Sequence, residues 1–195
     1  MSNHRHFKLH KPDGYISQFI YKSSRKKKVL SELFNFPEGT MSIGRLDELS
    51  EGLLLLTTDG KMSNYITSRK VEKEYYVLVD GTITQEAINQ MKTGVEIGIK
   101  GEKYLTNPCD ARLLATPPFI APRNKRIRDD RHGPSTWASI IINEGKYKQV
   151  RKMTAAVGFP TLRLIRMRIG NILLGDLKAG EVKELITLKQ GFQNL

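Results

Sequence analysis

The chain has 195 residues, of which 39% are hydrophobic and 27% charged, an average globular composition that excludes wholesale disorder. Its 32 Lys and Arg residues against 20 Asp and Glu residues give a formal net charge of +12, which favours a polyanionic partner, nucleic acid before an anionic membrane. No apolar run approaches the ~20 residues that span a bilayer, and the polar N-terminal segment does not resemble a signal peptide. The single cysteine excludes an internal disulfide and a cysteine-rich zinc site, so we expect a cytoplasmic protein without a metal.

The positive charge is concentrated in the second half of the chain. Residues 1–99 carry 14 Lys and Arg against 12 Asp and Glu, whereas residues 100–195 carry 18 against 8. A single basic run is more often a solvated face, but two basic clusters in one half favour a shared nucleic-acid-binding face. The first cluster lies in residues 123–131 and the second in residues 146–168. Neither cluster has the broad apolar face of a membrane-surface helix, so RNA or DNA is preferred.

Hydrophobic spacing and turn residues define the expected elements of the first third of the chain. In chain order they predict a strand at 7–9, a basic loop at 22–28, a helix at 29–36, a strand at 41–43, an irregular loop at 44–52, a buried strand at 53–57 and a helix at 61–67. The helix at 29–36 is expected to end at Pro37.

The same signals continue through the rest of the chain, where Thr84 is a candidate N-cap and Gly94 and Gly158 are candidate helix stops. They predict a strand at 74–79, a helix at 84–93, short strands within 95–115, a proline-containing loop at 116–134, a strand at 135–143, a helix at 147–157 and a strand at 161–169. With no internal repeat and no clear linker, the pattern predicts one α+β domain over 1–195.

The most informative stretch is GRLDELSEGLLLLTTDG, residues 44–60. It places Arg45 and Asp47 on a glycine-bounded loop that leads directly into a buried strand, an arrangement by which exposed catalytic side chains are often held. Taken alone, the loop favours the other interpretation, an Asp47 side chain that only caps the loop and pairs with Arg45.

This stretch resembles the catalytic motif of the pseudouridine synthases, in the branch of the ribosomal small-subunit synthase A and its large-subunit relatives. Three further segments resemble the family's other motifs in the same order: KP at 11–12, KEYYV at 73–77 and EGKYKQVRKM at 144–153. The likeness extends over about 8–186. The sequence departs from the family motifs at three positions: Ser50 replaces the usual Thr, Thr58 replaces Asn and Lys152 replaces Arg. None of these replacements removes a group that the reaction would need.

Residues 116–137 resemble the insertion of the large-subunit synthase E group, which lacks an N-terminal S4-type RNA-binding domain. The resemblance implies a mixed, largely antiparallel central sheet flanked by helices, with a central RNA-binding cleft. It also implies a single catalytic domain over 1–195 without an S4-type domain; two subdomains about the cleft are the alternative division.

The resemblance also implies the reaction, in which the N1–C1′ bond of a uridine breaks, the base turns, and C5 joins C1′. No redox change or group donor is needed, so no cofactor is expected. Asp47 matches the catalytic carboxylate, either as a nucleophile at C1′ or as a group that stabilises or deprotonates the sugar. Arg151 matches the basic partner that favours the charged carboxylate, and Tyr75 matches the tyrosine that stacks on the target base and is a candidate acceptor of the C5 proton.

A uridine within folded RNA must be flipped out of its stack before it can react. Arg45 matches the family arginine that fills the vacated space. We further expect basic residues to contact RNA phosphates, namely Lys11, Arg123, Arg126, Arg128, Arg163 and Arg166. The expected partner is structured RNA, first of all large-subunit ribosomal RNA, bound by a monomer. Two alternatives remain: the same reaction on another RNA, and a non-catalytic RNA-binding or ribosome-assembly protein.

Overall fold

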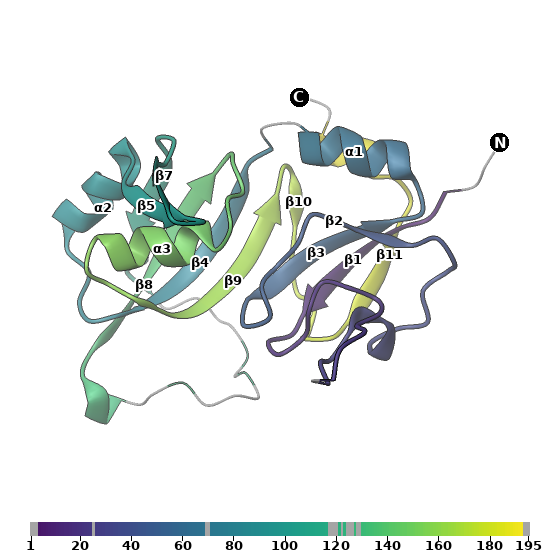
Figure 1. Ribbon diagram of the computed structural model, residues 1–195, viewed down its shortest axis with the longest axis horizontal. Helices are drawn as coiled ribbons and strands as arrows, with labels where there is room; N and C mark the ends of the chain where they lie inside the picture. Colours follow the sequence, from purple (N-terminus) through teal and green to yellow (C-terminus); the bar gives the residue numbers. More distant parts are fainter. Residues whose placement is uncertain are drawn as a thin grey trace. The chain divides into compact units, whose positions relative to one another are not determined.

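The computed structural model describes residues 4–24, 26–68, 71–116, 121, 123, 127 and 130–192 (Figure 1). The chain divides into two compact units. Unit 1 combines Met1–Val71 with Arg166–Leu195, and unit 2 is formed by Glu72–Ile165. Strand β9 (Thr161–Ile169) contributes its first residues to unit 2 and its last residues to unit 1.

Unit 1 is built on a sheet with the strand order β11-β1-β3-β9. Strand β1 pairs antiparallel with both β3 and β11, β2 pairs antiparallel with β3, and β10 pairs antiparallel with β9. Its strands are β1 (His6–Lys11), β2 (Met41–Ile43), β3 (Glu51–Thr57), β10 (Ile172–Leu173) and β11 (Val182–Leu185). Its helices are η1 (Leu30–Glu32), α1 (Gly60–Ser68) and η3 (Lys189–Phe192). The strands expected at 7–9, 41–43 and 53–57 and the helix at 61–67 are confirmed.

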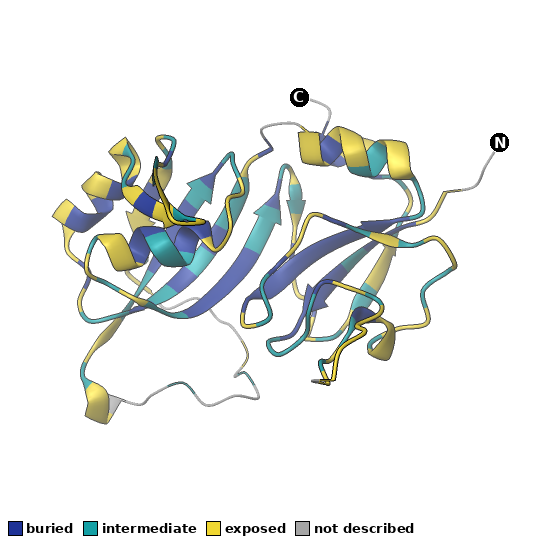
Figure 2. Ribbon diagram, viewed as in Figure 1, coloured by how far each residue is buried: buried dark blue, intermediate teal, exposed yellow. Residues whose placement is uncertain are grey.

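The core of unit 1 lies on one face of β1 and β3. Phe7 pairs with Leu56 and Leu9 pairs with Leu54, so the four side chains project from the same face, and all four are fully buried. Segments between β1 and β2 cover this face with Phe19, Leu30, Leu33 and Phe36. Burial of each large apolar side chain contributes about 1.5–3 kcal/mol. Strand β3 is buried along its whole length, as Figure 2 shows, which confirms the expectation of burial on both faces.

The expectation of a helix at 29–36 is wrong. Only one turn of 3₁₀ helix forms there, over Leu30–Glu32. Phe36 precedes Pro37, whose ring disfavours the α conformation at the preceding residue. The Phe36 ring instead packs edge-on against Phe7, with 5.6 Å between ring centroids, and against Phe19 at 5.4 Å. Aromatic packing with β1 therefore replaces local helical hydrogen bonds.

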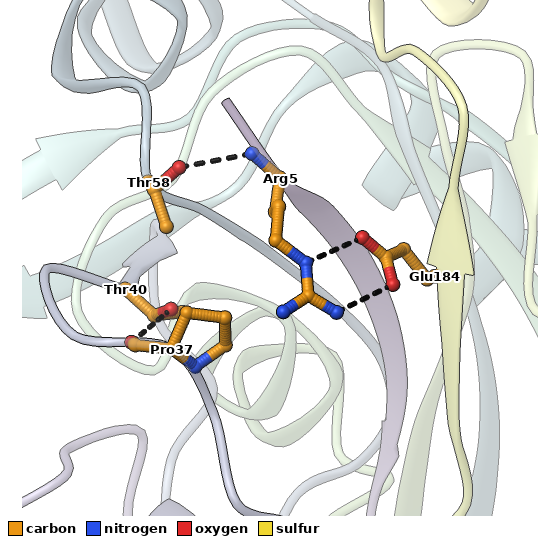
Figure 3. Close-up of polar contacts among 5 residues, drawn as sticks. All are labelled: Arg5, Pro37, Thr40, Thr58 and Glu184. Atoms are coloured by element: carbon orange, nitrogen blue, oxygen red, sulfur yellow. Dashed lines mark hydrogen bonds and ion pairs between the residues drawn. The ribbon is translucent and has the colours of Figure 1, made fainter. Parts of the chain in front are cut away.

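A polar contact joins the beginning of β1 to its neighbours (Figure 3). The Arg5 guanidinium donates from Nε and Nη2 to the two carboxylate oxygens of Glu184 on β11, both at 2.7 Å. The Arg5 backbone N–H donates to Thr58 Oγ1 at 2.9 Å, just after β3. The hydrogen bond from Arg5 lowers the pKa of the Glu184 carboxyl. The contact is half exposed to solvent, so it aligns the strand ends more than it stabilises the fold.

Unit 2 is built on a sheet with the strand order β9-β4-β8-β7. Strand β8 pairs antiparallel with both β4 and β7, and β5 and β6 form a separate hairpin. Its strands are β4 (Lys73–Asp80), β5 (Glu96–Ile99), β6 (Glu102–Leu105), β7 (Asp110–Leu113) and β8 (Ser135–Ile142), and its helices are α2 (Gln85–Thr93), η2 (Asp130–His132) and α3 (Gln149–Ala156). These elements and the α+β class agree with the sequence-based expectation.

Helix α2 shows how local signals decide the elements of unit 2. The Thr84 Oγ1 accepts a hydrogen bond from the backbone N–H of Ala87 at 3.2 Å, so Thr84 is the N-cap. Gly94 closes the helix with a positive φ of 102°. The buried residues Ala87, Ile88 and Met91 lie on the side of α2 that packs against β7.

Candidate active site

The loop of residues 44–50, called here the Asp47 loop, joins β2 to β3 in unit 1. The pairing of Ile43 with Leu55 fixes its beginning in the sheet, and β3 starts directly after it. The Asp47 side chain is half-buried, whereas Arg45 is exposed. The structure therefore places both predicted residues on a short loop whose two ends are anchored in strands.

Gly52 sets how closely β3 approaches β9. Its φ of +100° lies in the region that favours glycine. A Cβ at this position would lie 2.3 Å from the carbonyl oxygen of Arg166 and 2.6 Å from its backbone nitrogen, far inside van der Waals contact. Only glycine fits without a shift of one strand. The glycine of the family motif therefore allows β9 to lie directly beside the start of β3.

Arg166, on β9, is buried and binds the backbone around the Asp47 loop. Its side chain is only 3% exposed. Its Nε donates to the carbonyl oxygen of Leu53 at 2.7 Å, and its Nη1 donates to that of Arg45 at 3.4 Å. This placement does not support the predicted contact with an RNA phosphate, because the guanidinium is covered by protein and its hydrogen bonds go to carbonyls.

Lys11, at the end of β1, is also buried and bound to carbonyl oxygens. Its Nζ donates to Pro12 at 2.8 Å, to Tyr15 at 2.6 Å and to Glu48 of the Asp47 loop at 3.4 Å. Burial lowers the pKa of the Lys11 ammonium to about 7, a shift that the negative charge of Glu51 opposes. With its side chain fully buried, Lys11 joins β1 to the loop and is not placed to meet a phosphate.

Ser17 makes a third contact, which sequence reasoning missed. Its Oγ donates to the carbonyl oxygen of Leu46 and accepts from the Leu46 backbone N–H, both at 2.9 Å. Both groups are buried. A lone serine after a turn carries no sequence signal for this role, since the contact joins residues 29 positions apart.

A basic segment also lies against the Asp47 loop. Lys27 forms an ion pair with Glu48, with 2.5 Å between Nζ and Oε2. The same ammonium lies 5.6 Å from the centre of the Tyr21 ring. The ion pair between Lys27 and Glu48 therefore connects the predicted basic loop at 22–28 to the Asp47 loop.

In unit 2, Tyr75 lies on β4 opposite Ile140 of β8. Its side chain is 8% exposed, and every second residue from Tyr75 to Val79 is buried. Position and burial fit a tyrosine fixed by the sheet.

Arg151 lies in the first turn of α3 and is half-buried. The helix follows Lys148, whose φ of 52° and ψ of 33° are left-handed and which makes no side-chain cap. The start of α3 is held instead by Gln149, whose Oε1 accepts from the Lys146 backbone N–H at 3.0 Å and whose Nε2 donates to Glu144 at 2.6 Å.

Glu144 is the centre of this second network. Besides Gln149, its carboxylate accepts from the Tyr104 hydroxyl at 2.6 Å and from the Asn107 backbone N–H at 2.9 Å. These contacts join Tyr104 of β6, and Asn107 in the connection from β6 to β7, to the start of α3. The Glu and Gln of the family motif therefore orient the helix that carries Arg151.

The other predicted RNA-binding residues differ in burial and in whether the structure describes them. Arg163 on β9 is 5% exposed, and its Nη2 donates to the carbonyl oxygen of Ala121 at 3.0 Å. Arg123 is half-buried. Arg126 and Arg128 lie outside the described residues. The structure thus gives Arg163 a contact within the protein and leaves the phosphate contacts of the other three as predictions.

Within the part of the chain that the structure describes, no group of three or more His, Cys, Asp or Glu side chains is arranged to hold a metal ion. None of the described helices is long and apolar enough to cross a membrane.

The sequence and fold were compared with known proteins. Residues 5–156 match the family model described as RNA pseudouridylate synthase. The chain belongs to this family. It is 40% identical over 171 residues to a ribosomal large subunit pseudouridine synthase E of Xanthomonas axonopodis pv. citri, an alignment that covers 87% of each chain. It is 37% identical over 187 residues to the protein of the same name in Vibrio parahaemolyticus, which covers 95% of this chain and 75% of that one.

A solved structure described as a pseudouridylate synthase matches with a TM-score of 0.75 and 30% sequence identity, covering 98% of this chain and 74% of that one. The protein is therefore an RNA pseudouridine synthase, an isomerase that binds RNA. The family and the named relatives are synthases, which disfavours the non-catalytic alternative, and the matched range 5–156 includes Asp47, Tyr75 and Arg151.

Proposed function

We propose that this pseudouridine synthase converts a uridine of large-subunit ribosomal RNA to pseudouridine, with Asp47 as the catalytic carboxylate. The observation that carries the catalytic proposal is the structure of the Asp47 loop. Its carboxylate is half-buried, and its backbone carbonyls accept hydrogen bonds from Lys11, Ser17 and Arg166, which belong to three other segments. The proposal for the substrate rests on relatives 37–40% identical to this chain that are named ribosomal large subunit pseudouridine synthase E.

The chemistry needs a fixed carboxylate beside the sugar. During glycosidic cleavage, positive charge develops at C1′, and a carboxylate there either bonds to that carbon or stabilises the charge. After the base turns, C5 bonds to C1′, the C5 hydrogen leaves as a proton, and N1, which kept the electron pair of the broken bond, takes up a proton. One proton is lost and one is gained, so the isomerisation needs no co-reactant. Both the nucleophilic and the sugar-deprotonating routes remain open for Asp47.

The roles of the other predicted catalytic residues are part of the proposal. Tyr75 would stack on the target base, and its burial in β4 supports a fixed ring. Arg151 would supply the cation that favours an ionised catalytic carboxylate, and the Glu144 network that orients α3 supports a defined position for it. Arg45, exposed beside Asp47, would occupy the space of the flipped base.

We propose that basic residues other than the three buried cations bind the RNA phosphates. We keep Arg123, Arg126 and Arg128 as proposed phosphate contacts, and we withdraw Lys11, Arg163 and Arg166, whose side chains are buried and bound to carbonyl oxygens. RNA affinity falls as the salt concentration rises. Each phosphate contact that is lost should reduce the slope of the logarithm of the binding constant against the logarithm of the salt concentration by about one unit. We propose that the protein acts as a monomer in the cytoplasm; light scattering of the protein alone and with RNA would check its size.

The test uses transcripts with tritium at uridine C5, because bond formation at C5 releases that hydrogen to water. We expect release from a fragment of large-subunit ribosomal RNA and none from small-subunit RNA or transfer RNA. Carbodiimide mapping of pseudouridines in a strain that lacks the gene should show one missing site in the large-subunit RNA. Release from another RNA alone would overturn the substrate proposal, and release from none would overturn the reaction.

A further inference from the structure

Four successive carbonyl oxygens of the Asp47 loop accept hydrogen bonds. That of Arg45 accepts from Arg166 Nη1, that of Leu46 from Ser17 Oγ, and that of Asp47 from the Ser50 backbone N–H at 3.0 Å. The fourth, that of Glu48, accepts from the Gly14 backbone N–H at 2.7 Å and from Lys11 Nζ. Most connecting loops leave such groups to water, and this one does not.

The donor to the Asp47 carbonyl, Ser50, belongs to the loop itself, and the other donors come from three segments outside it: the end of β1, residues 14–17 and strand β9. Ser17 holds both polar backbone groups of Leu46, the residue directly before Asp47. Rotation about the backbone of Leu46 or Asp47 would break these bonds. The carboxylate is therefore restricted through its neighbours' backbone.

Arg166 is unusual in what it binds. Within the described residues it forms no ion pair with a carboxylate, although it is only 3% exposed. Its two hydrogen bonds go to the carbonyls of Arg45 and Leu53, which lie on either side of Asp47 in the sequence. A buried cation without an anionic partner is costly in free energy. Its planar fork spans Arg45 and Leu53, which a lysine could not do from one ammonium position.

We propose that Arg166 and Ser17 are positioning residues for Asp47, which hold the loop backbone on both sides of the carboxylate in its reactive conformation. The inference rests on the proposed function of Asp47. Arg166, first expected to bind an RNA phosphate, is thereby proposed to fix the position of the reacting carboxylate. A displacement of about 1 Å at a reacting group lowers a rate by up to about 100-fold, so loss of these bonds should act on the chemical step.

The test compares Arg166→Lys and Ser17→Ala with Thr57→Val. Thr57 is a buried hydroxyl of the same unit, at the other end of β3, which bonds the ring Nδ1 of His6 at 2.8 Å and the backbone N–H of Asp59 at 2.9 Å. Its loss costs the fold similar hydrogen bonds without touching the Asp47 loop.

Single-turnover tritium release at saturating enzyme separates chemistry from RNA binding. We expect Ser17→Ala and Arg166→Lys to slow release by about 10- to 100-fold while RNA affinity stays within about threefold, and Thr57→Val to keep the wild-type rate. Hydrogen exchange gives a readout that needs no substrate: the amide of Leu46 should exchange faster in Ser17→Ala and be unchanged in Thr57→Val.

Variants that react at the wild-type rate would overturn this inference and leave the proposed function standing. Equal losses in all three variants, in proportion to their melting temperatures, would also overturn it, because they would show a general effect on stability. A wild type that releases no tritium from any RNA would overturn the proposed function and the inference together.

Discussion

The two connections that carry the proposed catalytic residues are held in different ways. The Asp47 loop of unit 1 is bound through its backbone, by donors from Lys11, Ser17 and Arg166 that lie outside it. The connection before α3 in unit 2 is bound through side chains of its own, Glu144 and Gln149. The first loop should therefore be sensitive to substitutions at a distance, and the second to substitutions within its motif.

The largest expected effect comes from Gly52→Ala. The new Cβ would meet the backbone of Arg166 at 2.3 Å, at a positive φ, so β3 and β9 must separate. We expect a loss of at least about 3 kcal/mol in the free energy of unfolding, measured in urea, and loss of tritium release. The matched control is Gly44→Ala, also at positive φ but with no atom within 4 Å of the added Cβ, which should cost only about 1 kcal/mol. Equal losses for the two alanines would contradict the close approach of β9.

Glu144→Gln tests the side-chain network of unit 2. The amide cannot accept all three hydrogen bonds that the carboxylate accepts, so we expect a loss of about 1–3 kcal/mol in the free energy of unfolding. Because Arg151 lies in the first turn of α3, single-turnover tritium release should also fall by about tenfold. Glu102→Gln, at an exposed glutamate of β6, is the control and should change neither quantity. A wild-type rate of tritium release in Glu144→Gln would contradict the claim that the Glu144 network positions Arg151.

Lys11→Met tests the buried cation of unit 1 by its pH dependence. Burial lowers the pKa of Lys11 from 10.5 to about 7, so between these values the unfolded chain holds a proton that the folded chain has released. This lysine therefore makes the free energy of unfolding rise with pH above 7, by up to ~1.4 kcal/mol per pH unit, and its full cost is felt below pH 7. Urea unfolding at pH 6.5, 7.5 and 8.5 should show this slope in the wild type and a flatter one in the variant. Parallel profiles would contradict the shifted pKa.

Local signals predicted those parts of the fold that local chemistry decides. Helix α2 follows its Thr84 cap and Gly94 stop, and β3 follows its run of leucines. The segment at 29–36 was mispredicted because the Phe36 ring packs on Phe7, a contact across the chain that periodicity does not contain. The family motifs correctly indicated an RNA pseudouridine synthase, and the role of Asp47 remains a proposal.

The buried cations were the part of the candidate site that the sequence could not supply. Lys11, Arg163 and Arg166 have the same charge as a phosphate-binding residue, and only their burial distinguishes them. In β9 the apolar alternation slips between Leu164 and Ile165, a pattern that by itself indicates a β-bulge and not the burial of the neighbouring arginines. Four successive residues there are buried, including both arginines, which is typical of a strand covered on both faces.

The central claim is that Asp47 performs the chemistry while the protein around it fixes its position. Single-turnover tritium release by Asp47→Asn tests it most directly, with Asp59→Asn as the control, since Asp59 caps α1 and asparagine caps a helix equally well. We predict that Asp47→Asn folds, binds RNA within about tenfold of the wild type, and releases tritium at least about 1,000-fold more slowly, while Asp59→Asn reacts normally. Release by a folded Asp47→Asn at a rate near that of the wild type would contradict the account.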